Sequence, residues 1–252
     1  MAEIETFPDA ASLARAAANQ WVALAEASMA RHGQFSVALS GGSTPRALYS
    51  LLAASEFAAR VDWSRLHVFW GDERCVPPDD PESNYRMARQ ALLDHAPIPL
   101  SNVHRIPCEQ GPRQAAAAYE QTLHAWFSGG SAGRRVESDL PRFDLILLGM
   151  GEDGHTASLF PGAAALGERT RWVVAYKVVT LVAWRVTLTP LVINAAAHVM
   201  FLVSGANKAE KLRQVLTGPY RPDELPAQIV RPTRGHLVWW VDAAAASALA
   251  GA

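Results

Sequence analysis

The 252-residue chain predicts an α/β fold in which a mostly parallel β-sheet is covered by helices on both faces. Short apolar segments alternate along the chain with segments of helical periodicity, the pattern of parallel strands joined by helices. Half of the residues are hydrophobic and 19% are charged, a composition typical of globular domains. Three clusters of glycine and polar residues follow apolar segments directly. In this fold class such clusters gather where ligands bind, beyond the carboxyl ends of the strands.

The elements follow from periodicity and from the residues at their ends. A helix is predicted over 9–31, with Asp9 near its start and Gly33 after its end. Another helix follows the glycine pair at 41–42. The predicted strands are 35–39, 66–70, 102–107, 143–151, 171–176, 185–189, 198–205 and 236–242. The remaining helices are 83–96 (capped by Ser83 or Asn84), 113–127, 190–197, 206–217 and 242–250.

One domain covering residues 1–252 is expected. The small and polar stretch 128–141 is interpreted as a surface loop, because the alternation of strands and helices resumes behind it. The first residues show no basic segment followed by an apolar run, so no signal peptide is predicted. No apolar run is long enough to span a bilayer, and we expect a cytoplasmic protein, monomeric or a small homo-oligomer, with no membrane partner.

Composition also restricts the partners. The net charge is −1 and no basic stripe appears, which argues against nucleic acid and favours a small-molecule substrate. The two cysteines, Cys75 and Cys108, match no metal-binding spacing, and nothing in the sequence indicates a disulfide between them. We predict neither a metal nor another cofactor.

The first polar cluster is Ser40, Gly41, Gly42, Ser43 and Thr44, followed by a proline. Glycines allow positive φ and a close approach to a ligand, while Ser43 or Thr44 can cap the following helix. Free N–H groups at a helix start attract an anion. A capped turn without ligand and a phosphate cradle remain equally good interpretations. The spacing matches neither a nucleotide P-loop nor a dinucleotide loop, so any phosphate ligand is expected to be a small ester.

The second cluster is Asp72, Glu73 and Arg74, directly after an apolar strand. It is either ordinary surface charge or part of a site, and its position favours the site. Arg185 and Lys208 also lie near strand ends, where they are either solvated charges or cations that complete a phosphate site.

The third cluster, residues 149–158, carries the strongest signal. Three glycines surround Asp153 and His155 after the most apolar strand. Histidine is the best general base near neutral pH, and an aspartate two residues away can orient it. The other histidines are interpreted as structural; they are residues 32, 67, 95, 104, 124, 198 and 236.

Six segments, in order, resemble the successive motifs of the 6-phosphogluconolactonase family. They are "SGGSTPRALYSLL", "VFWGDERCVPPDDPESNYRMARQALL", "NVHRIP", "FDLILLGMGEDGHTASLFPG", "RVTLTPLVINAAAHVMFLVSGANKAEKLRQVL" and "LPAQIVRPTRGHLVWWVD". The resemblance implies a Rossmann-like three-layer α/β/α sandwich. It also implies hydrolysis of 6-phospho-D-glucono-1,5-lactone to 6-phosphogluconate in the oxidative pentose phosphate pathway.

The resemblance also implies site residues. His155 corresponds to the family's proposed catalytic base, and Asp153 accompanies it. The expected substrate- and phosphate-binding residues are Ser40, Gly41, Gly42, Ser43, Thr44, Arg46, Asp72, Arg74, Asn84, Arg185 and Lys208. One departure is the segment before Arg185, which reads "AYKVVTLVAW" where the family usually has a "PKPP"-like run, so Lys177 receives no role.

Two alternatives remain. Glucosamine-6-phosphate deaminases share the fold and the "DGH" motif, but they continue it with a glutamate where this chain has Phe160. A non-catalytic sugar-phosphate sensor would have the phosphate loop without a base, and His155 argues against it.

Overall fold

The computed structural model describes residues 3–128, 140–179 and 181–249. Most of the predicted surface loop at 128–141 and the last residue of the predicted helix 242–250 lie outside these ranges. Within them that helix is shorter than predicted and ends at Ala246. Six parallel strands form the main sheet in the order β1-β9-β8-β5-β2-β3. Their bounds are β1 Glu3–Phe7, β2 Phe35–Leu39, β3 Leu66–Trp70, β5 Leu145–Leu148, β8 His198–Val203 and β9 His236–Asp242.

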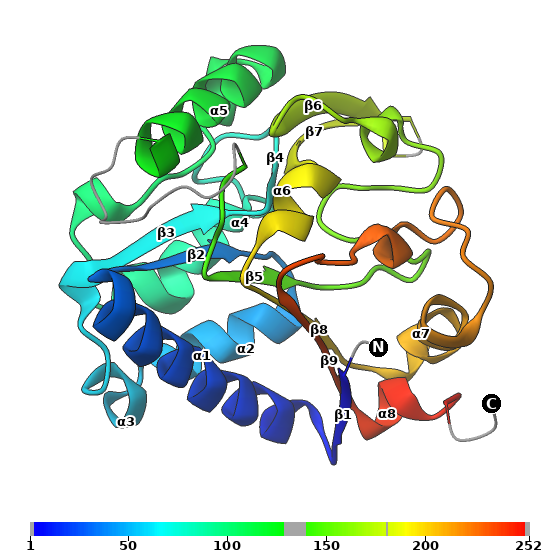
Figure 1. The fold of residues 1–252 in the computed structure, drawn as a ribbon, viewed down its shortest axis with the longest axis horizontal. Helices are drawn as coiled ribbons and strands as arrows, with labels where there is room; N and C mark the ends of the chain where they lie inside the picture. The colour runs from blue at the N-terminus through cyan, green and yellow to red at the C-terminus, as the bar shows by residue number, and fades with distance from the viewer. Residues whose placement is uncertain (1–2, 129–139, 180, 250–252) are drawn as a thin grey trace.

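Helices cover both faces of this sheet, as predicted. In Figure 1, α1 (Ala10–His32) and α2 (Ser43–Ala53) lie on one side of it, and α5 (Pro112–Ser128) and α6 (Pro190–Ala195) lie on the other. The shorter helices are α3 Ser55–Ala58, α4 Asn84–Ala88, α7 Ala209–Thr217 and α8 Ala243–Ala246. The three-layer α/β/α architecture is therefore confirmed.

The first long helix forms where its end signals predict it. The Asp9 carboxylate accepts a hydrogen bond of 2.7 Å from the Ser12 N–H, and Gly33 ends the helix in the left-handed conformation, with φ +82°. Ser83 caps α4 by accepting from the Arg86 N–H at 3.1 Å. The predicted helix 83–96 continues after α4 only as a π-helical turn, Arg89–Leu93.

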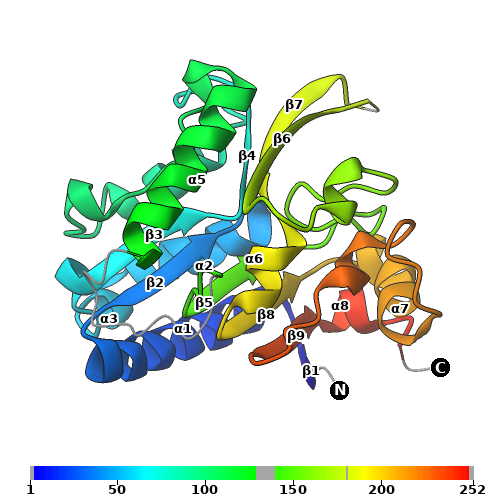
Figure 2. The ribbon, with the colours of Figure 1, turned by 45° about the horizontal axis from the view of Figure 1, so that its top comes forward.

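Two predicted strands do not belong to the main sheet. β6 (Val173–Val178) and β7 (Ala183–Leu188) pair antiparallel with each other, and β4 (Asp72–Arg74) pairs with β7 to complete a second sheet. Figure 2 shows this three-stranded sheet rising away from the parallel one. The sequence does not distinguish the two sheets, because apolar alternation reports that a strand is half-buried and not which partner it pairs with.

Two further expectations are wrong. The segment 102–107 forms no strand; it makes a single bridge between Val103 and Val68. Conversely, β1 forms although the sequence does not predict it, because most of its side chains are exposed and its sequence lacks an apolar run. It is held as an edge strand through parallel pairing with β9.

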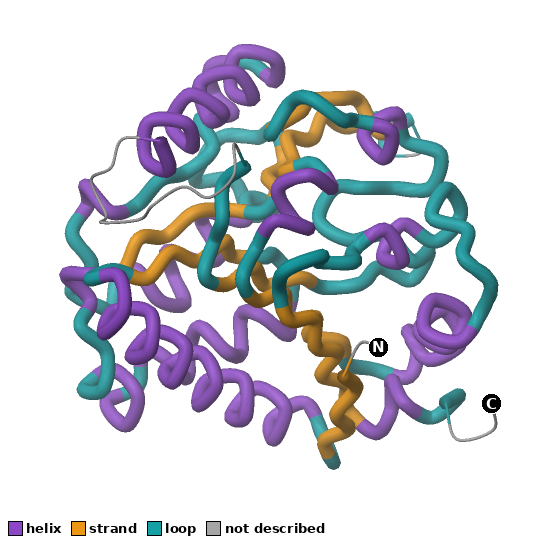
Figure 3. The backbone as a smooth tube through the Cα atoms, in the orientation of Figure 1, coloured by secondary structure: helices purple, strands orange, loops and turns teal. Residues whose placement is uncertain are grey.

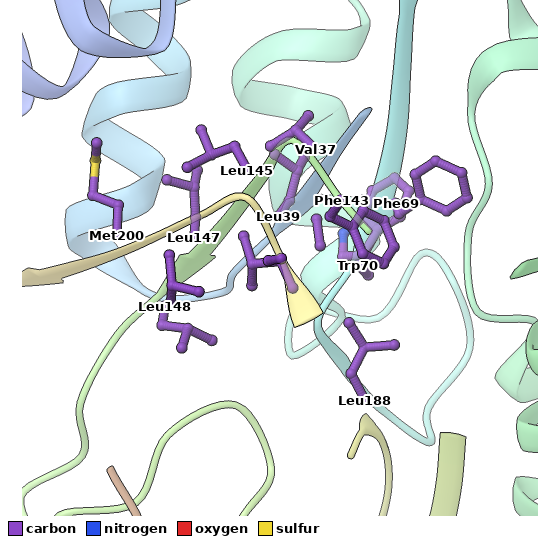
Figure 4. Packing of buried hydrophobic residues seen from close by; sticks show 14 of the residues in the cluster. Val37, Leu39, Phe69, Trp70, Phe143, Leu145, Leu147, Leu148, Leu188 and Met200 are labelled. Carbon is purple, nitrogen blue, oxygen red and sulfur yellow. The ribbon is translucent and has the colours of Figure 1, made fainter. Parts of the chain in front are cut away.

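The core is centred on β5, whose four residues are all buried. Figure 4 shows Leu145, Leu147 and Leu148 packed among side chains of the neighbouring strands, including Val37 and Met200. Each fully buried leucine contributes roughly 1.5–3 kcal/mol relative to an exposed one. This packing fixes the strand that leads into the third polar cluster. Figure 3 shows the predominantly looped segment that follows β5.

Candidate active site

The order of the strands brings two of the polar clusters together. β8, β5 and β2 are parallel neighbours, so the segments that follow them emerge at the same edge of the sheet. The Thr44 and Ser204 hydroxyls lie 2.8 Å apart and join the loops after β2 and β8. The loop after β5 meets the loop after β8 through Glu152, whose carboxylate lies 3.8 Å from the Lys208 ammonium.

The loop after β2 is held from below by a buried tyrosine. The Tyr49 hydroxyl accepts from the Ser40 N–H and donates to the Ser40 carbonyl, both at 2.9 Å. Gly42 caps α2 with φ +102°, a conformation that favours glycine, and no side chain caps the helix. The predicted Ser43 or Thr44 cap is therefore wrong, because α2 begins at Ser43 and both residues lie in its first turn; the Thr44 hydroxyl contacts Ser204. The N–H groups of the first turn of α2 thus have no side-chain cap.

Asn84 and Asp72 lie beneath this loop. A Cβ atom on Gly41 would come within 2.0 Å of the Asn84 Oδ1 atom, so only glycine fits there. The Asn84 side-chain amide donates to the Asp72 carbonyl at 2.9 Å, and Asp72 accepts from the Ser158 hydroxyl at 2.6 Å. Asp72 and Asn84 are only 6% and 3% exposed. Both residues therefore connect the Ser40–Thr44 loop to the segment 149–158, which carries His155.

Glu73 is part of the same support. Its buried carboxylate accepts from the backbone N–H groups of Arg74, Asn84 and Tyr85 at 2.7–2.8 Å and from the Ser83 hydroxyl at 3.1 Å. Burial raises the pKa of Glu73 even though these hydrogen bonds oppose the change. Glu73 fixes the start of α4, and with it Asn84.

Arg74 of the second polar cluster forms a pair with a second arginine, Arg185. Arg74 of β4 lies opposite Arg185 of β7 in the antiparallel register. Burial lowers the pKa of Arg185, and the charge of Arg74 lowers it further. Like charges at paired positions destabilise a sheet, and a bound anion would remove that cost. Arg74 donates to the Glu82 carbonyl at 2.6 Å, and Arg185 donates to the Trp184 carbonyl at 3.2 Å.

The turn after β5 holds the histidine and the aspartate together. The His155 Nδ1 atom lies 2.5 Å from the Asp153 carboxylate, which also accepts from the His155 N–H at 3.0 Å. A Cβ on Gly151 would come within 2.1 Å of His155 Nδ1, so this turn also requires glycine. The hydrogen bond from His155 lowers the pKa of Asp153 against the opposing effect of partial burial. The pair leaves His155 with Nε2 as its second ring nitrogen, the atom that can accept a proton.

The structure adds residues that the sequence did not single out. The Phe160 ring stacks on the His155 ring at a centroid distance of 4.2 Å. Ser158, Ser204 and Tyr49 hold the three loops together through the hydrogen bonds given above. Two signals could have found the serines: Ser204 directly follows β8, and Ser158 is the last residue of the third polar cluster, 149–158. Among the candidates, Arg46 is exposed on α2, and its backbone N–H donates to the Gly42 carbonyl.

Lys177 lies on β6, paired with Trp184 in the β6–β7 hairpin, and is exposed. Within residues 3–128, 140–179 and 181–249, no three histidine, cysteine or carboxylate side chains gather as a metal site would require. No helix in those ranges is long and apolar enough to cross a membrane.

Known proteins resemble this chain over most of its length. Residues 8–239 match the family described as glucosamine-6-phosphate isomerases/6-phosphogluconolactonase. A 6-phosphogluconolactonase of Nostoc sp. is 40% identical over 98% of both chains. That of Haemophilus influenzae is 39% identical over 83% of this chain and 85% of its own. The solved 6-phosphogluconolactonase structure from Trypanosoma cruzi superposes with a TM-score of 0.85 at 34% identity, covering 99% of this chain and 97% of its own. The chain therefore belongs to the glucosamine-6-phosphate isomerase/6-phosphogluconolactonase family.

Proposed function

We propose that this chain hydrolyses 6-phospho-D-glucono-1,5-lactone to 6-phosphogluconate in the oxidative pentose phosphate pathway, in the cytoplasm. The observation that carries the proposal is the Asp153–His155 pair, held in a glycine-dependent turn after β5. β5 is the parallel neighbour of β2, and the helix that follows β2, α2, starts without a side-chain cap. It is supported by the identity of 35–43% to several 6-phosphogluconolactonases over most of the chain.

In the proposed mechanism, His155 acts as the general base. With Nδ1 held by Asp153, the Nε2 atom takes a proton from water as the water oxygen attacks C1 of the lactone. The tetrahedral oxyanion is stabilised by backbone N–H groups or an arginine. The C1–ring oxygen bond then breaks, and the imidazolium returns the proton to the departing oxygen. No metal and no covalent intermediate are needed, because a δ-lactone is an activated ester.

We assign phosphate binding to the loop Ser40–Thr44 and to Lys208, completed by two further cations, Arg74 of β4 and Arg185 of β7. The uncapped N–H groups of α2 and its positive dipole end favour an anion. Binding the phosphate at a distance from C1 uses that interaction to position the reacting atom. Asp72 and Asn84 shape the loop from below in this assignment, and the exposed Arg46 of α2 stays a candidate phosphate ligand.

Phe160 favours this reaction over the deaminase alternative. The apolar ring occupies the position of the deaminase glutamate and covers one face of His155. Phe160 therefore stands where the deaminase reaction needs a carboxylic acid for its isomerisation step. We therefore expect no more ammonia release from glucosamine 6-phosphate than in a reaction without the protein.

The decisive experiment compares two lactones. Proton release is followed after adding fresh 6-phosphogluconolactone or plain gluconolactone, with spontaneous hydrolysis subtracted. We expect a much higher kcat/KM on the phosphorylated lactone. Equal catalytic efficiency on both would refute the phosphate site. No acceleration of either, with product still bound in calorimetry, would identify a sensor in place of an enzyme.

A further inference from the structure

The two cysteines of the chain lie side by side at the end of β4. Cys75 directly follows β4, and Cys108 opens the short 3₁₀ turn Cys108–Gln110 that precedes α5. They are 33 positions apart in sequence, yet their sulfur atoms lie 3.4 Å apart, with the Cys108 thiol donating to the Cys75 sulfur. Both cysteines are free thiols in this structure.

Backbone hydrogen bonds fix the positions of both cysteines. The Cys75 N–H donates to the Trp184 carbonyl at 3.1 Å, which extends the β4–β7 pairing by one residue. The Cys108 N–H donates to the Ile106 carbonyl at 3.0 Å, and its own carbonyl accepts from the Gly111 N–H. A disulfide bond is about 2.05 Å long, so the two sulfurs need to approach by only about 1.4 Å to bond.

The two thiols are not equivalent. Cys108 is 7% exposed, whereas Cys75 is partly exposed. The hydrogen bond from Cys108 lowers the pKa of Cys75, and the positive charge of Arg185 acts in the same direction, against burial and the charge of Glu73. The same hydrogen bond and burial raise the pKa of Cys108. Cys75 is thus the sulfur that an oxidant reaches first, with Cys108 in position to resolve it.

We propose that Cys75 and Cys108 form an oxidation site for hydroperoxides, closing reversibly into a disulfide beside Arg74 and Arg185. In the first step the Cys75 thiolate attacks the peroxide O–O bond and becomes a sulfenic acid, while the other oxygen leaves as hydroxide. In the second step Cys108 attacks the Cys75 sulfur, the S–S bond forms, and the sulfenic oxygen leaves as water. Two thiols and one hydrogen peroxide thus give one disulfide and two waters, and a dithiol reductant reverses the change. This chemistry does not depend on the proposed function.

The disulfide would join the end of β4 to the turn before α5. Closing a loop of this length constrains the unfolded chain, so the oxidised protein should unfold at a temperature roughly 5–10 °C higher. The crosslink also fixes the residue next to Arg74, and hence one side of the arginine pair.

The test uses the full chain, reduced and then exposed to hydrogen peroxide without denaturant. Because the sequence holds only two cysteines, thiol alkylation and intact mass give an unambiguous count. We expect the mass to fall by two hydrogen atoms, both reactive thiols to disappear within a monomer, and dithiothreitol to restore them. The proposal is wrong if both thiols persist, if only an intermolecular disulfide forms, or if oxidation proceeds directly to sulfinic acid.

Two matched variants test the order of the steps. Cys108→Ser lacks the resolving thiol, so Cys75 should accumulate as a sulfenic acid that a 1,3-dicarbonyl reagent labels. Cys75→Ser retains only the buried thiol and should remain unlabelled at the same peroxide concentration. Equal labelling of both variants would overturn the assignment of Cys75 as the attacking thiol. Serine is nearly isosteric with cysteine, and circular dichroism of each variant checks that it is folded. The wild-type thiol count does not depend on either variant.

Discussion

Two histidines of this molecule, His155 and His104, sit in opposite surroundings. His155 lies in the turn after β5, with a carboxylate at Nδ1 and an aromatic ring on one face. His104 lies against β3, stacked on Phe69 at 4.4 Å, with its Nε2 atom 3.2 Å from the His67 Nδ1 atom. Burial and the charge of His67 lower the pKa of His104 to about 4. The presence of a histidine therefore does not by itself indicate a catalytic base. What distinguishes His155 from His104 is its carboxylate partner and its place in the turn after β5.

The largest effect should come from His155. Replacing it with alanine or asparagine removes the proton acceptor, and turnover of the phosphorylated lactone should fall about 10²–10⁴-fold. Both variants should still bind 6-phosphogluconate in calorimetry, because the proposed phosphate site is intact. A His104→Gln variant serves as the control and should retain turnover. A folded, product-binding His155→Ala variant with near-normal turnover would show that another group activates the water.

Asp153→Asn tests what the carboxylate adds. The amide cannot hold the His155 Nδ1 proton as a carboxylate does, so we expect kcat to fall about 10²-fold, because positioning of the base is lost. KM should change little, since Asp153 is not assigned to the phosphate. Steady-state kinetics against spontaneous hydrolysis measures both parameters. If KM rises instead while kcat stays constant, Asp153 contacts the sugar and does not orient the base.

The cations should affect only the phosphorylated substrate. Lys208→Ala and Arg185→Ala should each lower kcat/KM. The loss should correspond to roughly 1.5–3 kcal/mol of transition-state stabilisation, the scale of a charge-assisted hydrogen bond. The rate on plain gluconolactone should be almost unchanged, so the preference between the two lactones narrows. Lys177→Ala, an exposed lysine in the β6–β7 hairpin, is the matched control. Wild-type efficiency in both site variants would mean that the phosphate lies elsewhere.

The half-buried His104 predicts a pH effect on stability. The unfolded chain protonates His104 near the ordinary value of 6.5, whereas the folded protein resists protonation down to about pH 4. The free energy of unfolding therefore falls as the pH drops from 6.5 towards 4, and we expect a loss of roughly 1–2 kcal/mol from this group, since it is partly exposed. Urea unfolding of wild type and His104→Gln at pH 7.5 and 4.5 measures it. An identical pH dependence in the variant would remove His104 as the cause.

The smallest effect concerns Glu152. Its carboxylate accepts from the Asn207 side chain at 2.6 Å and lies beside the Lys208 ammonium, so it competes with a phosphate for that cation. Glu152→Gln should lower KM for the phosphorylated lactone about two- to five-fold, because ion pairs with an exposed carboxylate contribute little free energy. Glu56→Gln removes an equally exposed carboxylate paired with Arg15 and should leave KM unchanged. A higher KM in Glu152→Gln would mean that Glu152 contributes to binding.

How far the sequence could predict the molecule depended on the kind of signal. The parallel sheet, its covering helices and the turn of His155 followed from apolar periodicity and glycine placement, and the comparisons confirm the fold and family. The antiparallel sheet of β4, β6 and β7 could not be foreseen, because strand pairing depends on which distant segment lies alongside. For the same reason the Thr44–Ser204 contact, between residues 160 positions apart, could not be foreseen.

The fit between Gly41 and Asn84 has a consequence for how this sequence can change over evolutionary time. Any side chain at position 41 collides with Asn84, and Asn84 cannot easily swing aside because its amide is bound to Asp72. Single substitutions at 41 should therefore be lost to selection, while the same substitution becomes tolerable beside a smaller residue at 84. Positions that lie 43 apart in the printed sequence are thus expected to be inherited as a pair.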